Sequence, residues 1–267
     1  MRGERNMDLG LTGKRALVLS AGSGLGRAIA LALAREGAVV CVANRSAAPV
    51  EETAAMIRAA GGQAHAFHWD LAEETQWRAG VQAVLDAVGG IDILVNNTGG
   101  PAPGPADGQA PEVWRRAFEA MVLSVFGITD LLLPGMRERG WGRIITSTSS
   151  GVITPIPNLG LSNSLRAALH GWSKTLARDV AAQGITVNVV VPGRIATART
   201  AFLDQARAQR EGRDAASVEA EAAAAIPMRR YGRPEEYGDA VAFLASERAA
   251  YITGTTLRVD GGLIPSV

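Results

Sequence analysis

Two side chains in the segment 161–177, LSNSLRAALHGWSKTLA, could act together on one oxygen atom of a ligand. The segment has helical spacing, and Ser162 and Arg166 stand at positions i and i+4, so they should share one face of the helix. A serine hydroxyl donates and accepts hydrogen bonds, and an arginine guanidinium donates them while keeping its charge at neutral pH. Such donors stabilise negative charge that develops on an oxygen, although neither side chain is a good general acid.

A glycine-rich loop follows the first apolar run of the chain. In LVLSAGSGLGRAIA, the residues Gly22, Gly24 and Gly26 lie between a predicted strand and a predicted helix. Glycines at such a turn let backbone N–H groups approach a pyrophosphate, which then lies at the positive N-terminus of the helix. The loop therefore favours dinucleotide binding, with an ordinary strand-to-helix turn as the alternative.

The end of the second predicted strand bears on which dinucleotide would bind. About twenty residues after the glycine loop, where an acidic residue would bind the adenosine ribose of NAD, the sequence ANRS places Asn44 and Arg45. A guanidinium at that place would pair with the 2′-phosphate of NADP. We therefore expect NADP(H) to be preferred over NAD(H); the alternative is a solvated arginine at a strand end.

Short apolar runs rich in β-branched residues alternate along the chain with longer segments of helical spacing. The runs are RALVLS, AVVCVAN, QAHAFHW, IDILVNN, GRIITSTS, ITVNVVV and TTLRVDGG. Strands that alternate with helices form a parallel sheet covered on both faces. The sequence therefore predicts an α/β fold, a single-domain Rossmann-type doubly wound parallel sheet of about seven strands over residues 11–267, after a tail at residues 1–10.

Two segments depart from this alternation. Residues 99–111, GGPAPGPADGQAP, are dense in glycine and proline and are predicted to be a loop. Residues 197–226 are rich in alanine and alternate in charge just after a strand and a Pro-Gly turn. Their place after a strand end favours a cap over a substrate site at the carboxyl edge of the sheet, with a solvated pair of surface helices as the alternative.

The composition bears on the partners and the location of the protein. The chain has 27 Lys and Arg residues against 26 Asp and Glu residues, so we expect a small-molecule substrate and no nucleic acid or anionic membrane. The one cysteine, Cys41, lies in an apolar run and can form no internal disulfide, which suits the cytoplasm. No apolar signal core and no long uninterrupted apolar stretch is present, so neither export nor a membrane span is expected. His65 and His68 have no third ligand nearby, so no metal site is expected.

Motifs in a fixed order carry a family resemblance. SAGSGLG resembles the loop T-G-x-x-x-G-x-G, and NNTG at residues 96–99 resembles N-N-A-G. VNVVVPGRIAT resembles V-N-x-V-x-P-G-x-x-x-T, and YITGTTLRVDGG resembles I-T-G-x-x-x-x-V-D-G-G. From residue 11 to 263 the chain thus resembles the short-chain dehydrogenase/reductase family, in particular its β-ketoacyl-acyl-carrier-protein reductase-like branch. The resemblance implies a nicotinamide cofactor, hydride transfer to a carbonyl, and a homo-oligomer, usually a tetramer, with helices near 112–139 and 160–182 packed between subunits.

The resemblance also implies which residues contact the cofactor. Asp70 in WDLA matches the acidic residue at the adenine, and Asn96 matches the asparagine that lies along the adenosine. The PGRIAT stretch matches the part of the family that covers the nicotinamide, and Ser20 replaces the first loop glycine. The complete expected set is Ser20, Gly22, Ser23, Gly24, Leu25, Gly26, Asn44, Arg45, Asp70, Leu71, Asn96, Thr98, Gly99, Pro192, Gly193 and Thr197.

Of the four catalytic positions that the resemblance assigns, only one is unchanged. Ser149 matches the catalytic serine, whereas Ser162 stands at the tyrosine, Arg166 at the lysine and Met121 at the asparagine. In the family the tyrosine gives its proton to the substrate oxygen and the lysine lowers the pKa of that tyrosine. We therefore expect a non-standard catalytic set in which Ser149 and Arg166 stabilise negative charge and Ser162 or a water relays the proton.

Three functions remain open at this point. The first is an NAD(P)-dependent oxidoreductase acting on a carbonyl, such as a 3-oxoacyl group, or on a conjugated double bond. The second is a homologue that binds a cofactor or ligand without net redox chemistry, as a lyase, an isomerase or a sensor. The third is a structural subunit kept for its interfaces. The retained glycine loop and the PGRIAT stretch favour the first over the third.

Overall fold

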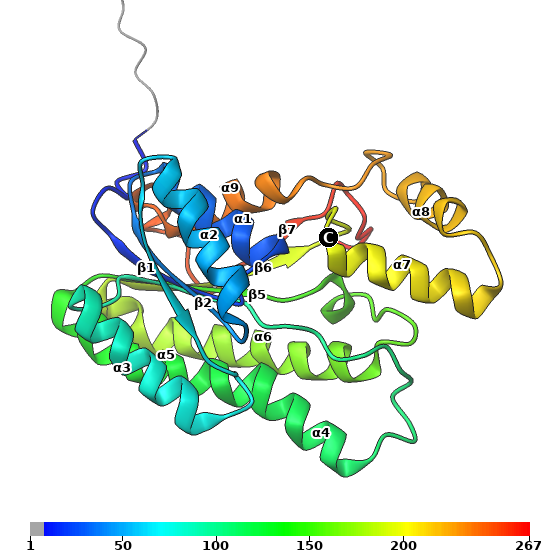
Figure 1. Ribbon diagram of the computed structural model, residues 1–267, viewed down its shortest axis with the longest axis horizontal. Helices are drawn as coiled ribbons and strands as arrows, with labels where there is room; N and C mark the ends of the chain where they lie inside the picture. Colours follow the sequence, from blue (N-terminus) through cyan, green and yellow to red (C-terminus); the bar gives the residue numbers. More distant parts are fainter. Residues whose placement is uncertain (1–7) are drawn as a thin grey trace, which may run out of the picture.

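A computed structural model describes residues 8–267, which fold around one parallel sheet with helices on both faces (Figure 1). The seven strands are β1 Arg15–Leu19, β2 Val39–Asn44, β3 Gln63–His68, β4 Ile93–Asn96, β5 Gly142–Ser147, β6 Ile185–Pro192 and β7 Thr256–Val259. Their order is β3-β2-β1-β4-β5-β6-β7, and every neighbouring pair is parallel. Each apolar run of the sequence holds one strand, so the predicted fold class is confirmed. Residues 1–7 of the expected tail lie outside the described residues.

The helices divide between the two faces of the sheet. They are α1 Gly24–Arg35, α2 Ala47–Ala59, α3 Glu74–Val88, α4 Pro111–Phe118, α5 Ser124–Arg139, α6 Gly160–Val180, α7 Ala198–Glu211, α8 Ala215–Ala224 and α9 Pro234–Ala245. Helices α1, α2 and α9 cover one face, and α3, α5 and α6 cover the other. The two helices α7 and α8 extend beyond the sheet (Figure 1).

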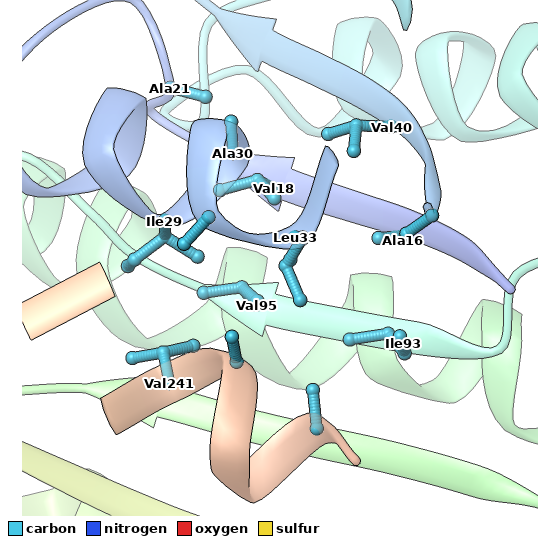
Figure 2. Close-up of a cluster of buried hydrophobic side chains, with 14 of the residues drawn as sticks. Ala16, Val18, Ala21, Ile29, Ala30, Leu33, Val40, Ile93, Val95 and Val241 are labelled. Carbon is cyan, nitrogen blue, oxygen red and sulfur yellow. The ribbon is translucent and has the colours of Figure 1, made fainter. Parts of the chain in front are cut away.

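The alternation of side chains along β1 builds two separate cores. Ala16 and Val18 point to the face covered by α1 and α9, where they pack with Ile29, Leu33 and Val241 (Figure 2). Leu17 and Leu19 point to the opposite face and pack against α3, α5 and α6. Burial of one such aliphatic side chain stabilises a fold by about 1.5 to 3 kcal/mol. A slip of β1 by one residue would move the side chains of each core to the other face, so packing on both faces holds the register of this strand.

Helices α4 and α5 form one continuous helix, Pro111–Arg139, interrupted by a π-helical turn at Glu119–Leu123. By length and composition alone this helix could cross a membrane, which the expectation of no membrane span did not foresee. Part of it packs inside the protein, since Phe126 stacks on Trp172 of α6 with ring centroids 4.7 Å apart. Val113, Phe118 and Leu123 on the same helix remain exposed.

The segment expected to form a cap is a pair of helices, α7 and α8, as its composition indicated. An ion-pair network joins them, because Arg207 contacts Glu211 at 2.8 Å and Glu221 at 2.6 Å. Arg213 contacts the same Glu221 at 2.6 Å. The two helices therefore form a single unit after β6; their action as a cap over substrate stays a prediction.

A buried carboxylate joins the amino ends of the central strands, at the edge opposite the glycine loop. Asp92, 7% exposed, accepts hydrogen bonds from Arg15 Nε at 2.9 Å and Arg15 Nη2 at 2.8 Å. Arg139 Nε lies 2.9 Å from Asp92 Oδ1 and brings in the end of α5. Burial works to raise the pKa of Asp92, but the hydrogen bonds and charge of Arg15, with the charge of Arg139, lower it below its usual value.

We expect Asp92→Asn to lower the free energy of unfolding by about 1 to 3 kcal/mol at neutral pH, because the partly exposed Arg15 and Arg139 lose the charge of their buried carboxylate partner. A carboxylate whose pKa is lowered in the folded state stabilises above its unfolded pKa and loses that contribution as pH falls through the folded pKa. The difference between wild type and variant should therefore shrink below about pH 4. Urea unfolding at several pH values measures this. Glu74→Gln, which removes the exposed pair with Arg78, is the control and should change little; an equal effect of both substitutions contradicts the assignment.

Candidate active site

The glycine loop lies at the carboxyl end of β1 and leads into α1. Ser20, at the position of the first family glycine, adopts the left-handed conformation with φ +49°, and Gly24 has φ +53°. A β-carbon at Gly26 would lie 2.3 Å from the carbonyl oxygen of Ser20, so only glycine lets α1 pack this closely on the loop. The N-cap residue, Ser23, makes no side-chain capping bond, which leaves the first N–H groups of α1 available to a ligand.

Two side chains that sequence reasoning did not single out hold this loop in place. Arg27 Nη2 donates to the Gly22 carbonyl at 2.6 Å, and Arg27 Nε donates to Thr53 Oγ1 at 3.0 Å. Thr53 Oγ1 in turn donates to the Ala21 carbonyl at 3.0 Å. Helices α1 and α2 thus hold two carbonyls of the loop through the side chains of Arg27 and Thr53.

A cavity of about 500 Å³ opens beside the loop, along the carboxyl ends of β1, β2 and β4. Six of the expected cofactor contacts line it: Ser20, Asn44, Arg45, Asp70, Leu71 and Gly99. Trp69, Arg116 and Met121 also line it, and of these only Met121 had been considered from the sequence. Residues from five separate segments therefore meet in one cavity where α/β sheets bind ligands.

The walls of the cavity are preorganised by short-range bonds. Asp70 Oδ1 accepts from the Ala72 backbone N–H at 3.0 Å, which fixes the turn after β3. Asn44 lies against the glycine loop, since a β-carbon at Gly22 would be 2.7 Å from Asn44 Nδ2. Arg45 is exposed and forms no ion pair with any carboxylate among residues 8–267, so its charge is available to a ligand.

The structure places Asn96 outside the lining of the cavity, and its contact with the cofactor stays a prediction. This residue is fully buried, and its Nδ2 donates to Thr129 Oγ1 of α5 at 3.2 Å, so the side chain does not line the cavity. Alternation along the strand turns the next residue to the other face: Asn97 Nδ2 donates to the Leu19 carbonyl at 3.2 Å. Asn97 therefore ties β4 to the glycine loop, a role that the family resemblance had not indicated.

Arg166 is buried behind the loop that follows β4 and does not itself line the cavity. Its Nη2 donates to the carbonyls of Thr98 at 3.0 Å and Gly99 at 3.1 Å, and its Nη1 donates to the Ser147 carbonyl at 3.3 Å. Burial lowers the pKa of Arg166 to about 10, so the group stays charged at neutral pH. These bonds direct the guanidinium to the ends of β4 and β5. From the sequence, Arg166 was expected to act on a substrate oxygen, and its bonds to the backbone were not predicted.

Ser162 and Ser149 lie at the start of α6 and just after β5. Ser162 is 7% exposed, and its hydroxyl has no hydrogen-bond partner within the described part of the chain. Ser149 Oγ accepts from the Gly151 backbone N–H at 3.1 Å. Met121 lies in the π-helical turn and packs with Leu165 of α6, so it fills space in the core as its residue type suggested.

The loop over residues 99–110 packs on the start of α6. Gly104 N–H donates to the Asn158 carbonyl at 2.8 Å, and Gly160 N–H donates to the Gly104 carbonyl at 3.0 Å. A β-carbon at Gly160 would lie 2.5 Å from the backbone of Ala106, so this loop comes within contact of the helix two residues before Ser162. The loop expected from its glycine and proline content is confirmed, and it borders the catalytic positions.

The PGRIAT stretch lies between β7 and the glycine loop. Gly193 N–H donates to the Val259 carbonyl at 2.9 Å, which places Pro192 and Gly193 beside β7. Thr197 caps α7, and its Cγ2 would lie 3.6 Å from a β-carbon at Gly24. The structure thus brings Thr197 to the glycine loop, although these residues do not line the cavity itself. The position of Thr98 differs from expectation in the same way, because its side chain is buried beneath the loop.

These features define a class of protein. A doubly wound parallel sheet with a glycine loop after β1, an uncapped helix N-terminus and a cavity at the carboxyl edge is a Rossmann-type fold with a dinucleotide-type site.

Comparison with known proteins specifies the family. A family model described as enoyl-(acyl carrier protein) reductase matches residues 20–264. The chain is 38% identical to the 3-oxoacyl-[acyl-carrier-protein] reductase of Escherichia coli (strain K12) over 257 residues, covering 94% of this chain and 97% of that protein. It is 33% identical to the 7alpha-hydroxysteroid dehydrogenase of the same strain, covering 96% of each chain. The crystal structure of L-sorbose reductase from Gluconobacter frateurii, complexed with NADPH and L-sorbose, superposes with a TM-score of 0.92 at 33% identity, covering 98% of this chain and 100% of that one. The protein belongs to the short-chain dehydrogenase/reductase family.

Proposed function

We propose that this protein is an NADP(H)-dependent oxidoreductase that reduces a carbonyl group. The observation that carries the proposal is the cavity in which Arg45, Asp70 and the glycine loop meet. Family membership and the NADPH complex of L-sorbose reductase support a nicotinamide cofactor. Reduction of a 3-oxoacyl group, or of a related carbonyl, is favoured over reduction of a conjugated double bond because the hydroxyl donors of the site are suited to an oxygen.

The residues present fit a nicotinamide dinucleotide. The uncapped N-terminus of α1 offers N–H groups to a pyrophosphate, and Gly26 permits the close packing on which that geometry depends. Arg45, exposed and unpaired, suits a 2′-phosphate, and Asp70 with Leu71 suits the adenine. Pro192, Gly193 and Thr197 would border the nicotinamide end. The bound cofactor would supply the hydride.

The chain's own groups would bind and orient the carbonyl oxygen. Ser162 has a hydroxyl without a partner among residues 8–267, so it can donate a hydrogen bond to that oxygen. Ser149 would donate the second hydrogen bond from the end of β5. The buried charge of Arg166 lies behind the loop and stabilises negative charge as it develops. The proton would reach the oxygen from Ser162 or from water, since a guanidinium does not release one at neutral pH.

We also propose that the protein is a cytoplasmic homo-oligomer and that it needs neither nucleic acid nor a membrane. Burial raises the pKa of the Cys41 thiol to about 12, so the thiol is unreactive and makes no demand for an oxidising compartment. Phe118 and Leu123 are exposed apolar side chains on the helix Pro111–Arg139, and this helix would pack on the same helix of another copy.

Arg45→Ala should raise the Kd for NADPH about 10- to 100-fold and leave the Kd for NADH unchanged, because only NADPH carries the 2′-phosphate. Fluorescence titration with each nucleotide measures both constants. The control is Arg78→Ala, which removes an exposed arginine that pairs with Glu74 at 2.6 Å away from the cavity. Equal weakening of both nucleotides by Arg45→Ala would argue against a 2′-phosphate contact, and no binding of either by wild type would overturn the proposal.

Ser162→Ala and Ser149→Ala should each lower kcat for ketone reduction about 100- to 1000-fold, because each removes a donor to the developing oxyanion. The Kd for NADPH should stay the same. Steady-state NADPH oxidation with a panel of 3-oxo esters, simple ketones and enones measures kcat. The control is Ser164→Ala, an exposed serine on the same helix, which should behave as wild type. If Ser162→Ala turns over at the wild-type rate, its hydroxyl is not a donor.

Leu123→Glu, combined with Phe118→Glu, should dissociate the oligomer, since these side chains are 45% and 38% exposed on the proposed interface. Light scattering after size exclusion measures the mass, which should fall from that of a tetramer or dimer to that of one chain. Phe202→Glu, at 50% exposure on α7, is the matched control and should leave the mass unchanged. A monomeric wild type would refute the interface.

A further inference from the structure

Arg199, the second residue of α7, reaches across the site to the loop that follows β4. Its Nη2 donates to the Pro101 carbonyl at 2.7 Å, and the same nitrogen would lie 3.0 Å from a β-carbon at Gly100. Gly100 and Pro101 line the cavity. The guanidinium therefore stands between the cap helices and the inner end of the cleft.

Arg199 differs from the other arginines of its helix in having no carboxylate partner. Arg207 and Arg210 each lie within 4 Å of Glu211. Within the described part of the chain, no carboxylate forms an ion pair with Arg199. Its Cζ lies 5.5 Å from the centroid of the Phe202 ring, which holds the planar group without neutralising it.

A second uncompensated cation lies behind the same loop. Arg166 binds the carbonyls of Thr98 and Gly99, and Arg199 binds that of Pro101, so two guanidinium groups hold consecutive parts of one loop. Burial is the main cause that lowers the pKa of Arg166; the charge of Tyr237 acts to raise this pKa, and the like charge of Arg199 acts to lower it through mutual repulsion. An anion bound between them would relieve this repulsion.

The donor geometry of Arg199 suits an anion with two oxygens. A guanidinium has five N–H donors in a planar fork, and the bond to Pro101 uses only one of them. We propose that Arg199 binds an anionic group of a ligand in this cleft, either a carboxylate of the substrate or the pyrophosphate of the cofactor. The substrate alternative rests on the proposed reductase function, whereas the cofactor alternative needs only nucleotide binding.

The test compares Arg199→Gln, Arg199→Lys and the control Arg210→Gln with wild type. Glutamine keeps an N–H donor for the Pro101 carbonyl but loses the charge, so it separates anion binding from a purely structural contact. The Kd for NADPH is measured by fluorescence. With NADPH saturating, acetoacetate and its uncharged ethyl ester are then compared for binding and for NADPH consumption, in which the ketone carbon gains a hydride and its oxygen gains a proton.

Wild type should prefer acetoacetate over the ester by about 10- to 100-fold in kcat/KM, and loss of this preference in Arg199→Gln with the Kd for NADPH unchanged identifies a substrate carboxylate. A rise of about 10- to 100-fold in the Kd for NADPH identifies the pyrophosphate. In either case Arg199→Lys should recover part of the loss and Arg210→Gln should have no effect.

Arg199→Gln that changes neither the Kd for NADPH nor the discrimination between acetoacetate and its ester overturns the inference. Binding that depends on Arg199 without any NADPH consumption supports the inference and contradicts the reductase function instead. The two proposals therefore fail in different measurements.

Discussion

A single buried guanidinium joins the parts of this site. Arg166, on α6, binds the carbonyl oxygens of Thr98 and Gly99 after β4 and of Ser147 at the end of β5. Parallel strands leave such carbonyls unpaired where each strand gives way to a loop, and a buried carbonyl without a donor costs free energy. One planar group with several donors satisfies the ends of two strands at once. The start of the loop over 99–110 and the end of β5 are therefore both tied to α6 by these bonds.

Arg166 stays charged at neutral pH although its side chain is buried. Burial lowers the pKa of the group to about 10, which means that the folded state disfavours the charged form compared with water. The carbonyl dipoles offset part of that cost, but no carboxylate among residues 8–267 pairs with the group. By contrast, the buried Asp92 at the opposite edge of the sheet has Arg15 and Arg139 as partners.

Sequence patterns predicted the sheet well because each strand lies in an apolar run that can be recognised without knowledge of the surrounding fold. The glycine loop was also predicted, since Gly26 has a steric reason to be glycine that the spacing reveals. The side-chain directions at strand ends were less predictable. Whether Asn96 or Asn97 faces the glycine loop depends on the backbone direction at one residue, and the sequence did not indicate that Asn97 would bind there. Arg27, Thr53 and Arg199 act across long sequence separations, and no local pattern distinguishes them from surface residues.

The replacements at residues 162 and 166 form a consistent pair. A lysine beside a tyrosine serves to lower the pKa of a phenol, and this purpose disappears when the hydroxyl is aliphatic. With Ser162 at this position, a lysine ammonium would have no phenol whose pKa it could lower. The guanidinium of Arg166 instead donates to three carbonyls in fixed directions from two of its nitrogens. A lysine ammonium has a single nitrogen and would not reach the three carbonyls with the same geometry. In the proposed catalytic set a fixed positive charge therefore takes the place of the charge that would tune a phenol, and restoring tyrosine alone would place a phenol beside a guanidinium that already donates three bonds to the backbone.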